Sequence, residues 1–417
     1  IVFIIYTLFS PLIFILILIS STFNSKIRRH LLCVSKSVKY AKIKINEQKK
    51  HKEIILFHAA SSGEFEQLKP ILSKVNREKY FILLTFFSPT IFEKEKQNSL
   101  VDIVCYHPFD LPWSAFLFFF KIKPKKYIIT RHDIWPFHLV IAKFLSIETI
   151  FINANLYDNS FRFKRGLKSF NRLLFNQFDL ILTGSENLKN IIKKLSPDSN
   201  VVITGDSRFD QVIERSLKSD NNLIPKSFKN SRNIILGSIV NSDLEVISKA
   251  LKQLGNSFFN KRLQLIIVPH EVQEKDLSPI ENLLIKKRLH YQRLSNYDEI
   301  NHAPVLIIDK VGILPDLYKY AKIAYVGAGF STGVHSVIEP AVHKCAVIYG
   351  PYFDILDEAI EMAENKSGTV VNNGNELGLF FKKISNIKEI EILGERAYKY
   401  VINKQNASER ILNEIFV

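Results

Sequence analysis

Cysteine is scarce in this 417-residue chain, and its three cysteines form no recognisable site. Cys33, Cys105 and Cys345 are far apart and show neither a C-x-x-C pair nor a Cys/His spacing. This argues against a disulfide framework and against a zinc site. No D-x-D triplet is present, and histidines and carboxylates do not cluster at the spacing of metal ligands. The sequence therefore favours chemistry without a bound metal and indicates no cofactor.

Charged residues are absent from the first 25 positions, which contain the run IVFIIYTLFSPLIFILILIS. An apolar run of this length can cross a bilayer as a helix. Ten lysines and arginines follow between Lys26 and Lys52, against one acid, Glu47. Because basic flanks stay cytoplasmic, we expect a transmembrane anchor at 1–22 with its N-terminus outside, then a basic cytoplasmic linker at 23–52. A cleaved signal peptide is the alternative, but the basic start of such peptides is missing.

Acidic residues are too few to balance the basic ones, which leaves a formal net charge of +16. Such a charge predicts an anionic partner: nucleic acid, anionic lipid or a phosphorylated substrate. The linker supplies +9, from ten basic residues and one acid, so +7 remains for the rest. Because the basic residues are concentrated in the linker and no nucleic-acid motif is present, we expect no nucleic-acid partner. A membrane-tethered nucleic-acid-binding or scaffold protein remains the alternative of a different class.

Short apolar runs alternate with longer amphipathic stretches over the rest of the chain, which is typical of α/β proteins with parallel sheets. A polar stretch containing Pro225 separates two groups of predicted strands. We expect domains at 53–212 and 232–417, joined by a linker at 213–231, with the last helix a candidate to pack back on the first domain. Ligands of such domains bind at the carboxyl ends of the strands. The predicted strands are 54–58, 80–85, 102–106, 126–130, 149–153, 178–183 and 201–204, then 233–238, 264–268, 304–308, 322–327, 345–349 and 368–371.

The first predicted strand ends at His58 and continues into A-A-S-S-G-E-F-E, where Glu64 falls in the first turn of a helix. A glutamate there stabilises the positive end of the helix dipole. It also suits a general base, because group transfer to a hydroxyl requires removal of the acceptor proton. The spacing leaves both interpretations open.

In the second half, V-G-A-G-F-S-T-G-V-H-S-V-I-E-P-A follows a strand and leads into a helix. Gly329 and Gly333 permit close backbone approach, and a helix N-terminus near His335 is expected to offer N–H groups to a phosphate. Glu339, four residues later, would share the helical face of His335 and accept hydrogen bonds from ribose hydroxyls. A helix-surface carboxylate is the alternative. The turn G-P-Y-F-D at 350–354 is expected on the same side.

Residues 161–174, FRFKRGLKSFNRLL, are expected to form an amphipathic helix whose basic stripe includes Arg165 and Lys168. Such a stripe is either a solvated face or a surface that meets anionic headgroups or acceptor phosphates.

Taken together, these segments resemble the Kdo (3-deoxy-D-manno-octulosonic acid) transferases, in order over most of residues 54–365. The resemblance rests on H-A-A-S-S-G-E-F-E at 58–66, H-P-F-D at 107–110, D-I-W-P at 133–136, I-N-A-N-L at 152–156, G-D-S-R-F-D at 205–210, V-P-H-E at 268–271, D-K-V-G-I-L at 309–314, the glycine loop up to Pro340, and G-P at 350–351.

This resemblance implies an α/β, GT-B fold with two facing Rossmann-like domains. It implies an inverting, metal-independent glycosyltransferase that moves Kdo from CMP-Kdo to a lipid A precursor, lipid IVA, in lipopolysaccharide core biosynthesis at the cytoplasmic face of the inner membrane. The family's catalytic base falls on Glu64. The donor-binding residues expected from the loop and the resemblance are Ser238, His270, Gly329, Gly333, His335, Ser336 and Glu339. The expected acceptor-binding residues are Ser62, Gly63, Arg165 and Lys168.

The chain departs from the family pattern at three places. Many members have an acidic residue where Arg131 or His132 stands, an arginine between the residues that here are Pro269 and His270, and an asparagine at Ser336. These positions bear on the donor contacts, above all on the partner of the Kdo carboxylate. The nearest enzymatic alternative is another GT-B transferase that uses a UDP-sugar and a lipid acceptor.

Overall fold

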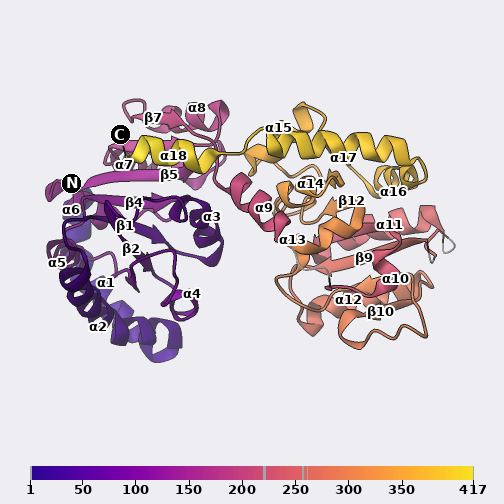
Figure 1. Ribbon diagram of the computed structural model, residues 1–417, viewed down its shortest axis with the longest axis horizontal. Coiled ribbons are helices and arrows are strands. Elements are labelled where there is room, and N and C mark those ends of the chain that lie inside the picture. Colours follow the sequence, from indigo (N-terminus) through magenta and orange to yellow (C-terminus); the bar gives the residue numbers. More distant parts are fainter. Residues whose placement is uncertain (1, 219–221, 256–257, 261, 417) are drawn as a thin grey trace. The chain divides into compact units, whose positions relative to one another are not determined.

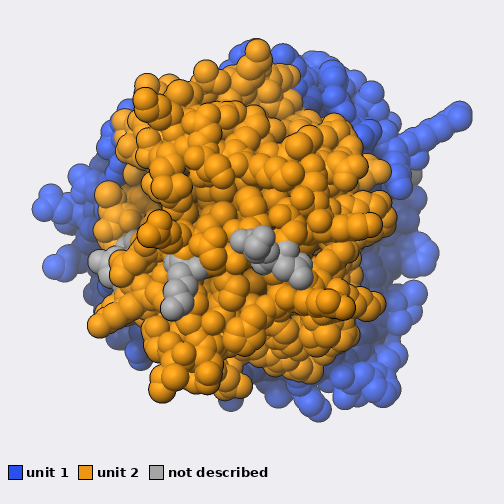
Figure 2. Space-filling model, turned by 90° about the vertical axis from the view of Figure 1, so that its right-hand side faces the viewer, with its two compact units in different colours: residues 1–211, 406–417 blue, residues 212–405 orange. Residues whose placement is uncertain are grey.

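The computed structural model describes residues 2–218, 222–255, 258–260 and 262–416 (Figure 1). The chain divides into two compact units, coloured separately in Figure 2: unit 1 is residues 1–211 with 406–417, and unit 2 is residues 212–405. Each unit contains one seven-stranded sheet, and the strands of both sheets pair in parallel. The predicted α/β fold with two parallel sheets is confirmed.

The sheet of unit 1 has the order β3-β2-β1-β4-β5-β6-β7. Chain order therefore reverses between the neighbours β1 and β4, and ligands of such sheets bind outside the carboxyl ends of the strands at this switch point. The strands are β1 Glu53–Ala59, β2 Tyr80–Phe86, β3 Ile103–Tyr106, β4 Lys126–Thr130, β5 Glu148–Ala154, β6 Leu180–Thr183 and β7 Val201–Ile203. The connecting helices are α3 Ser62–Leu72, α4 Pro89–Glu95, α5 Pro112–Ile122, α6 Pro136–Phe144, α7 Lys168–Phe175 and α8 Glu186–Leu195, with the 3-10 turn η1 Phe161–Phe163.

Both faces of this sheet are covered, as the apolar runs of the sequence require. On β1, Ile54 and Leu56 belong to one apolar core, whereas Ile55 and Phe57 belong to the other. This alternation follows from the two-residue period of a strand. The strand is therefore fixed from both sides, which gives the residues at its carboxyl end a rigid base.

The predicted anchor is helix α1, Val2–Phe23, and its residues Phe3–Phe23 are long and apolar enough to cross a membrane. The helix nevertheless lies along unit 1. The ring of Phe3 packs against Phe137, with the centroids 6.2 Å apart, and the Tyr6 hydroxyl donates a hydrogen bond to the carbonyl of Asp110 (3.2 Å). Phe14, two turns later, meets Trp113 of α5 edge-to-face.

Helix α1 is thus long and apolar enough to span a membrane, as the sequence analysis expected, and its orientation in a membrane stays a prediction.

The predicted basic linker is also a helix, α2, Ser25–Gln48, and it forms part of the fold. Val38, Ala41 and Ile45 of α2 are buried in the core of unit 1 beside β3 and α5. Positions three to four residues apart line one face of a helix. The sequence analysis followed the charge of this segment and overlooked this apolar stripe, so the linker prediction is wrong here.

Unit 2 repeats the architecture, with the strand order β10-β11-β9-β8-β12-β13-β14 and a switch point between β8 and β12. Its strands are β8 Arg232–Ile239, β9 Leu263–Pro269, β10 Tyr291–Arg293, β11 Val305–Ile307, β12 Ala321–Val326, β13 Ala346–Tyr349 and β14 Gly368–Val370. Its helices are α10 Lys226–Lys229, α11 Leu244–Leu254, α12 Glu274–Lys286, α13 Leu314–Leu317, α14 Ile338–Val342, α15 Asp357–Glu364, α16 Gly374–Lys382 and α17 Ile387–Ile402. The edge strand β10 was not predicted.

The predicted interdomain linker at 213–231 contains more helix than expected, because α9, Arg208–Leu217, runs into it and α10 follows; residues 219–221 of this linker lie outside the described residues. The last helix, α18, Ala407–Ile415, returns to unit 1. Its Ile411 and Ile415 join the core that β1 and α3 form. Asp210 holds its start by accepting hydrogen bonds from the amides of Asn406 (2.7 Å) and Ser408 (2.6 Å).

Candidate active site

Glu64 lies where β1 turns into α3, beside the switch point of the first sheet. Ser61 caps the helix by accepting a hydrogen bond from the Glu64 amide (3.3 Å), and Glu64 Oε2 accepts from the amides of Ala60 (2.7 Å) and Ser61 (3.3 Å). This reciprocal capping box fixes the carboxylate at the mouth of the sheet. Glu64 therefore stabilises the start of helix α3, which is one of the two roles that the sequence analysis left open. Within the described residues, no group donates to its other oxygen, Oε1, which leaves that atom able to take a proton.

Burial sets the acidity of Glu64. The side chain is only 7% exposed, and this burial raises its pKa, as does the negative charge of Asp133, while the Ala60 amide and His58 oppose the rise. A carboxylate with a raised pKa is a better proton acceptor than an ordinary surface glutamate. The environment of Glu64 is thus the kind that active sites use to tune a base.

Asp133 and His58 form a polar network beside Glu64 that the sequence analysis did not assign to the site. Asp133 Oδ2 accepts hydrogen bonds from His58 Nε2 (2.8 Å) and from the indole of Trp135 (2.6 Å). The His58 ring stacks on His107 at 3.9 Å between centroids, deep under the sheet's carboxyl edge. All four residues belong to the short blocks at 58–66, 107–110 and 133–136, so the blocks located this network but their spacing could not reveal its hydrogen bonds.

The residues predicted to bind the acceptor substrate divide into two groups. Ser62 and Gly63 are exposed at the start of α3, and a Cβ placed on Gly63 would meet no atom within 4 Å, so the backbone is accessible there. Arg165 and Lys168 are also exposed, but the predicted helix at 161–174 is interrupted. Gly166 has φ +89°, and α7 starts only at Lys168, because a left-handed residue cannot continue the helix.

In unit 2, the glycine loop connects β12 to α14 at the switch point of the second sheet. It pairs with the turn at 350–354, since the Tyr352 amide donates to the Gly329 carbonyl (2.9 Å) and the Val334 amide donates to the Tyr352 carbonyl (2.9 Å). A Cβ on Gly329 would lie 2.6 Å from the backbone nitrogen of Gly350. The glycines are therefore needed for contact between two loops, and the predicted neighbourhood of these loops is confirmed.

The expected helix start at His335 is wrong, because α14 begins only at Ile338. The amides of Val334 and His335 donate to the carbonyls of Tyr352 and Gly327 and so do not point into an open helix N-terminus. Gly333, with φ +112°, makes the bend that permits this pairing. His335 precedes the five-residue helix that carries Glu339, so the two side chains do not share a helical face.

His270 and His335 meet although 65 residues separate them in sequence, and their rings stack with centroids 4.4 Å apart. Burial, together with the neighbouring His270, lowers the pKa of His335 to about 4, so this imidazole is neutral at physiological pH. His270 also lines a cavity of about 340 Å³ with Ser242, Ser331 and Thr332. The structure thus brings together two of the predicted donor-binding residues, and one of them, His270, lines this cavity.

Asp243 holds the wall of this cavity and was not predicted. Its buried carboxylate accepts hydrogen bonds from the amides of Val240 (3.0 Å) and Ala328 (2.9 Å) and from the Tyr325 hydroxyl (2.7 Å). It therefore joins the turn after β8 to the glycine loop. The signal in the sequence was its position three residues after Val240, where a carboxylate can complete a capping arrangement.

The other residues predicted to bind the sugar donor lie nearby but do not line the cavity. Ser238, at the end of β8, has φ +54°, and its carbonyl would lie 2.4 Å from a Cβ on Gly327. Ser336 is partly buried in the loop before α14. Glu339, also partly buried, is close enough to Tyr318 to raise the pKa of that phenol, after the larger effect of burial. In the described part of the chain, no group of three or more His, Cys, Asp or Glu side chains could hold a metal ion.

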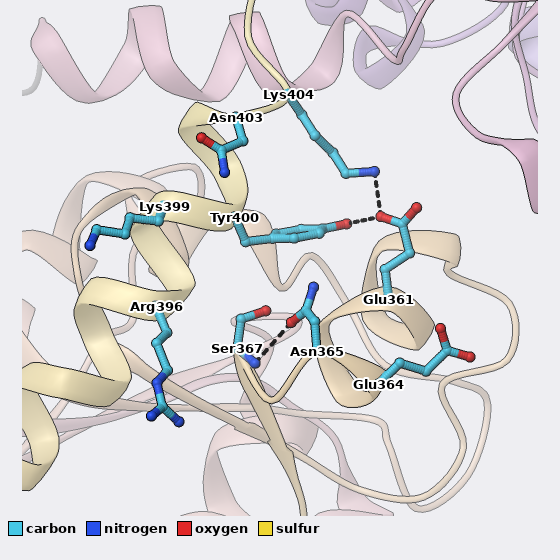
Figure 3. Close-up of a pocket in the computed structure, with 9 residues that line it drawn as sticks. All are labelled: Glu361, Glu364, Asn365, Ser367, Arg396, Lys399, Tyr400, Asn403 and Lys404. Atoms are coloured by element: carbon cyan, nitrogen blue, oxygen red, sulfur yellow. Dashed lines mark hydrogen bonds and ion pairs between the residues drawn. The ribbon is translucent and has the colours of Figure 1, made fainter.

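A larger hollow of about 690 Å³ lies elsewhere in unit 2, between α15 and α17 (Figure 3). In it Glu361 accepts a hydrogen bond from the Tyr400 hydroxyl (2.6 Å) and pairs with Lys404. None of the predicted site residues lines this hollow. The size of a hollow alone therefore does not identify it as the functional site.

Comparison with known proteins gives relatives for most of the chain. The sequence model of a family described as 3-deoxy-D-manno-octulosonic-acid transferase (kdotransferase) matches residues 36–211. The 3-deoxy-D-manno-octulosonic acid transferase of Aquifex aeolicus is 29% identical over 335 residues, covering 80% of this chain and 86% of the relative. The protein of the same name from Haemophilus influenzae is 27% identical over 371 residues, covering 86% of each chain.

Solved structures resemble the fold. A glycosyltransferase from Rickettsia africae superposes with a TM-score of 0.59 at 15% identity, covering 87% of this chain and 97% of the other. A putative UDP-N-acetylglucosamine 2-epimerase from Listeria monocytogenes gives a TM-score of 0.65 at 11% identity, covering 87% and 96%. These neighbours and the two parallel sheets confirm the GT-B class. Because the neighbours carry names of different reactions, fold alone does not identify the chemistry.

Proposed function

We propose that this chain is a Kdo transferase, because the model of that family matches residues 36–211 and relatives of that name are 29% and 27% identical over most of the chain. In the proposed activity it moves Kdo from CMP-Kdo to a lipid A precursor, lipid IVA, in lipopolysaccharide core biosynthesis. The observation that carries this proposal is the buried Glu64, held by a capping box at the switch point of unit 1, with one carboxylate oxygen left for a proton.

In the proposed reaction, Glu64 Oε1 takes the proton of an acceptor hydroxyl as the hydroxyl oxygen bonds to the anomeric carbon of Kdo. The bond from that carbon to the CMP phosphate breaks on the opposite side, so the configuration inverts. The raised pKa of Glu64 supports this role, because the proton is accepted by a carboxylate that burial makes more basic. The open backbone at Gly63 leaves room for the acceptor to approach.

Unit 2 would bind the donor. The glycine loop at 327–335 and the cavity beside His270 are the proposed place for the CMP group, and preorganised dipoles would stabilise the charge that develops on its phosphate. The neutral His335 could hydrogen-bond the nucleotide without adding charge. Ser238, Ser336 and Glu339 remain proposed donor contacts of the same loop region, with Glu339 holding the ribose.

We place the enzyme at the cytoplasmic face of the inner membrane. Helix α1 exposes a run of large apolar side chains, and α5 exposes Trp113, Phe116, Leu117 and Phe120. The basic residues of α2 would favour an anionic lipid surface, by about 1 kcal/mol for each basic residue close to it. Attachment at this face would keep the acceptor lipid within reach of Glu64.

The test is transfer of labelled Kdo from CMP-Kdo, generated in situ, to tetra-acylated lipid A precursor, by the wild type and by Glu64→Gln. We expect the variant to lose about 10²- to 10⁴-fold in rate, the usual contribution of a general base, with CMP affinity unchanged. Glu66→Gln is the matched control, because Glu66 lies on the same helix but is partly exposed and pairs with Lys69.

Two results would contradict the proposal. No transfer by folded wild-type protein, in detergent with or without EDTA, would reject the Kdo reaction and call for a screen of UDP-sugars. Equal rates for Glu64→Gln and the wild type would reject the base and keep the reaction.

A further inference from the structure

Asp133 lies three residues after β4, beside the switch point of the sheet in unit 1, and only one of its two carboxylate oxygens is bonded. Oδ2 accepts hydrogen bonds from His58 Nε2 (2.8 Å) and from the indole of Trp135 (2.6 Å). Among the residues that the structure describes, no group donates to Oδ1. The side chain is 27% exposed and Oδ1 is not buried, so a bound molecule can reach this oxygen.

A buried chain of polar side chains holds this carboxylate in place. A carboxylate oxygen only accepts, so His58 Nε2 carries the proton of its bond to Asp133. The opposite ring nitrogen, Nδ1, lies 3.0 Å from the hydroxyl of Thr85. That hydroxyl lies 3.2 Å from His107 Nδ1, and His107 Nε2 lies 3.2 Å from the hydroxyl of Tyr127. Because these four side chains are buried, they fix which oxygen of Asp133 faces inward and which stays open.

Asp133 keeps its negative charge. Burial raises its pKa, but the two hydrogen bonds to Oδ2 and the charge of His58 bring the pKa below its usual value. Arg162 is close enough to Asp133 for their charges to interact. Its hydrogen bonds go instead to the side-chain oxygen of Asn171 (2.9 Å) and to the carbonyl of His132 (3.3 Å). The arginine therefore leaves Oδ1 open.

The charge of Asp133 limits what this oxygen can bind. An ionised carboxylate accepts hydrogen bonds from hydroxyl groups and repels anions. In the proposed reaction, the Kdo carboxylate and the CMP phosphate of the donor are anionic, whereas the sugar of the acceptor carries neutral hydroxyls. The charge of Asp133 also acts on Glu64, so the two carboxylates lie at the same edge of the sheet. The position of Oδ1 therefore suits a hydroxyl of the acceptor.

We propose that Asp133 Oδ1 accepts a hydrogen bond from a second hydroxyl of the acceptor sugar and so orients the attacking hydroxyl toward Glu64. This rests on the proposed function for the identity of the acceptor. His58 and Trp135 are positioning residues in this proposal, because they hold Oδ2. The acceptor thus needs two hydroxyls, one that loses its proton to Glu64 and one that binds Asp133.

Asp133→Asn tests this with almost no change of shape. Because His58 and Trp135 both donate, the asparagine oxygen takes the inner position and the amide NH₂ group replaces Oδ1. An acceptor of hydrogen bonds at the open position thereby becomes a donor. We expect the acceptor KM to rise about 10- to 100-fold, the loss of one hydrogen bond to a charged group, with the donor KM unchanged.

Acceptor analogues identify the contact. In each analogue, one sugar hydroxyl other than the attacking one is replaced by hydrogen. For the analogue that lacks the bound hydroxyl, wild type and Asp133→Asn should have the same KM, because the contact is already missing. An equal rise in KM for every analogue would overturn the proposal. A rise in the donor KM alone would also overturn it, because Asp133 would then contact the donor.

Two further variants separate this contact from a general effect on the fold. Asp158→Asn is the matched control, since Asp158 is exposed and pairs with Lys194, and it should leave the acceptor KM unchanged. Trp135→Phe removes one donor to Oδ2 and keeps an aromatic ring, so it should raise KM less, and only for acceptors that have the bound hydroxyl. It also serves if Asp133→Asn unfolds, as judged by thermal unfolding. A rise in KM that is equal for all analogues would reject the positioning role of Trp135.

A binding measurement separates this inference from the proposed function. Calorimetric titration of wild type and Asp133→Asn with a de-acylated lipid A precursor needs neither CMP-Kdo nor transfer. Weaker binding by the variant would support the contact even if Kdo transfer failed. Equal binding by both proteins would overturn the contact while leaving the transfer reaction intact.

Discussion

The two units have the same kind of sheet, but different chemical groups surround the switch points of the two sheets. At the switch point of unit 1 the side chains are ionisable, with Glu64, Asp133 and Arg162 at the same edge of the sheet. At the switch point of unit 2 the backbone dominates, through the paired loops at 327–335 and 350–354 and a neutral His335. The difference fits the proposed division of roles, in which unit 1 accepts a proton and unit 2 binds the donor nucleotide. The following predictions test this contrast.

Asp243→Ala should have the largest effect on stability. It leaves two amides and the Tyr325 hydroxyl without their buried acceptor, which should cost about 3 kcal/mol at ~1 kcal/mol for each hydrogen bond. Because the loops of unit 2 shape its receptor, CMP affinity should fall too. Urea unfolding and calorimetric titration with CMP measure both. Intact CMP binding at lowered stability would show that the receptor does not depend on this carboxylate.

Gly329→Ala should have the next largest effect on stability. The new Cβ would lie 2.6 Å from the Gly350 nitrogen, so the two loops must separate, at a cost of about 1–3 kcal/mol. CMP binding should weaken, while the pH profile of any remaining transfer should keep the position set by unit 1. A shift in that profile would break the proposed separation between the units.

Asp133→Asn should shift the pH dependence of the transfer rate more than it lowers the maximum rate. Burial is the main cause of the raised pKa of Glu64, and the Asp133 charge adds to it, so removing that charge lowers the pKa of Glu64. Since the ionised carboxylate is the active form, the acid limb of kcat/KM should move to lower pH. Asp158→Asn, at an exposed position paired with Lys194, is the control and should leave the limb in place. A limb that moves upward would contradict Glu64 as the titrating base.

Gly63→Ala should have the smallest effect on stability, within about 0.5 kcal/mol, since its Cβ would meet no protein atom within 4 Å. If acceptor approaches this backbone, the acceptor KM should rise at unchanged melting temperature. An unchanged KM would remove Gly63 from the acceptor site.

The sequence predicted the sheets well because buried parallel strands are continuous apolar runs. The edge strand β10 was missed because Tyr291–Arg293 is three residues long and only partly buried, so it carries no such run. The start of α14 was placed too early because the Val334 amide pairs with Tyr352 in the turn at 350–354 and the His335 amide pairs with Gly327, so neither amide belongs to the helix. The sequence analysis missed Asp243, Arg162 and the His58–Asp133 hydrogen bond for the same reason. Each depends on which loops meet in the fold, and the spacing of residues along one segment does not contain that information.

Helix α18 determines when unit 1 can finish folding during synthesis. Residues 406–416 leave the ribosome only after all of unit 2, yet Ile411 and Ile415 fill the core of unit 1 and the Phe416 ring stacks on Tyr80 of β2. During synthesis, the first sheet therefore stays with an uncovered apolar strip until its last helix arrives. Nascent unit 1 should be open to chaperones or proteases throughout that interval, and it should reach its final stability only after all of unit 2 has been synthesised.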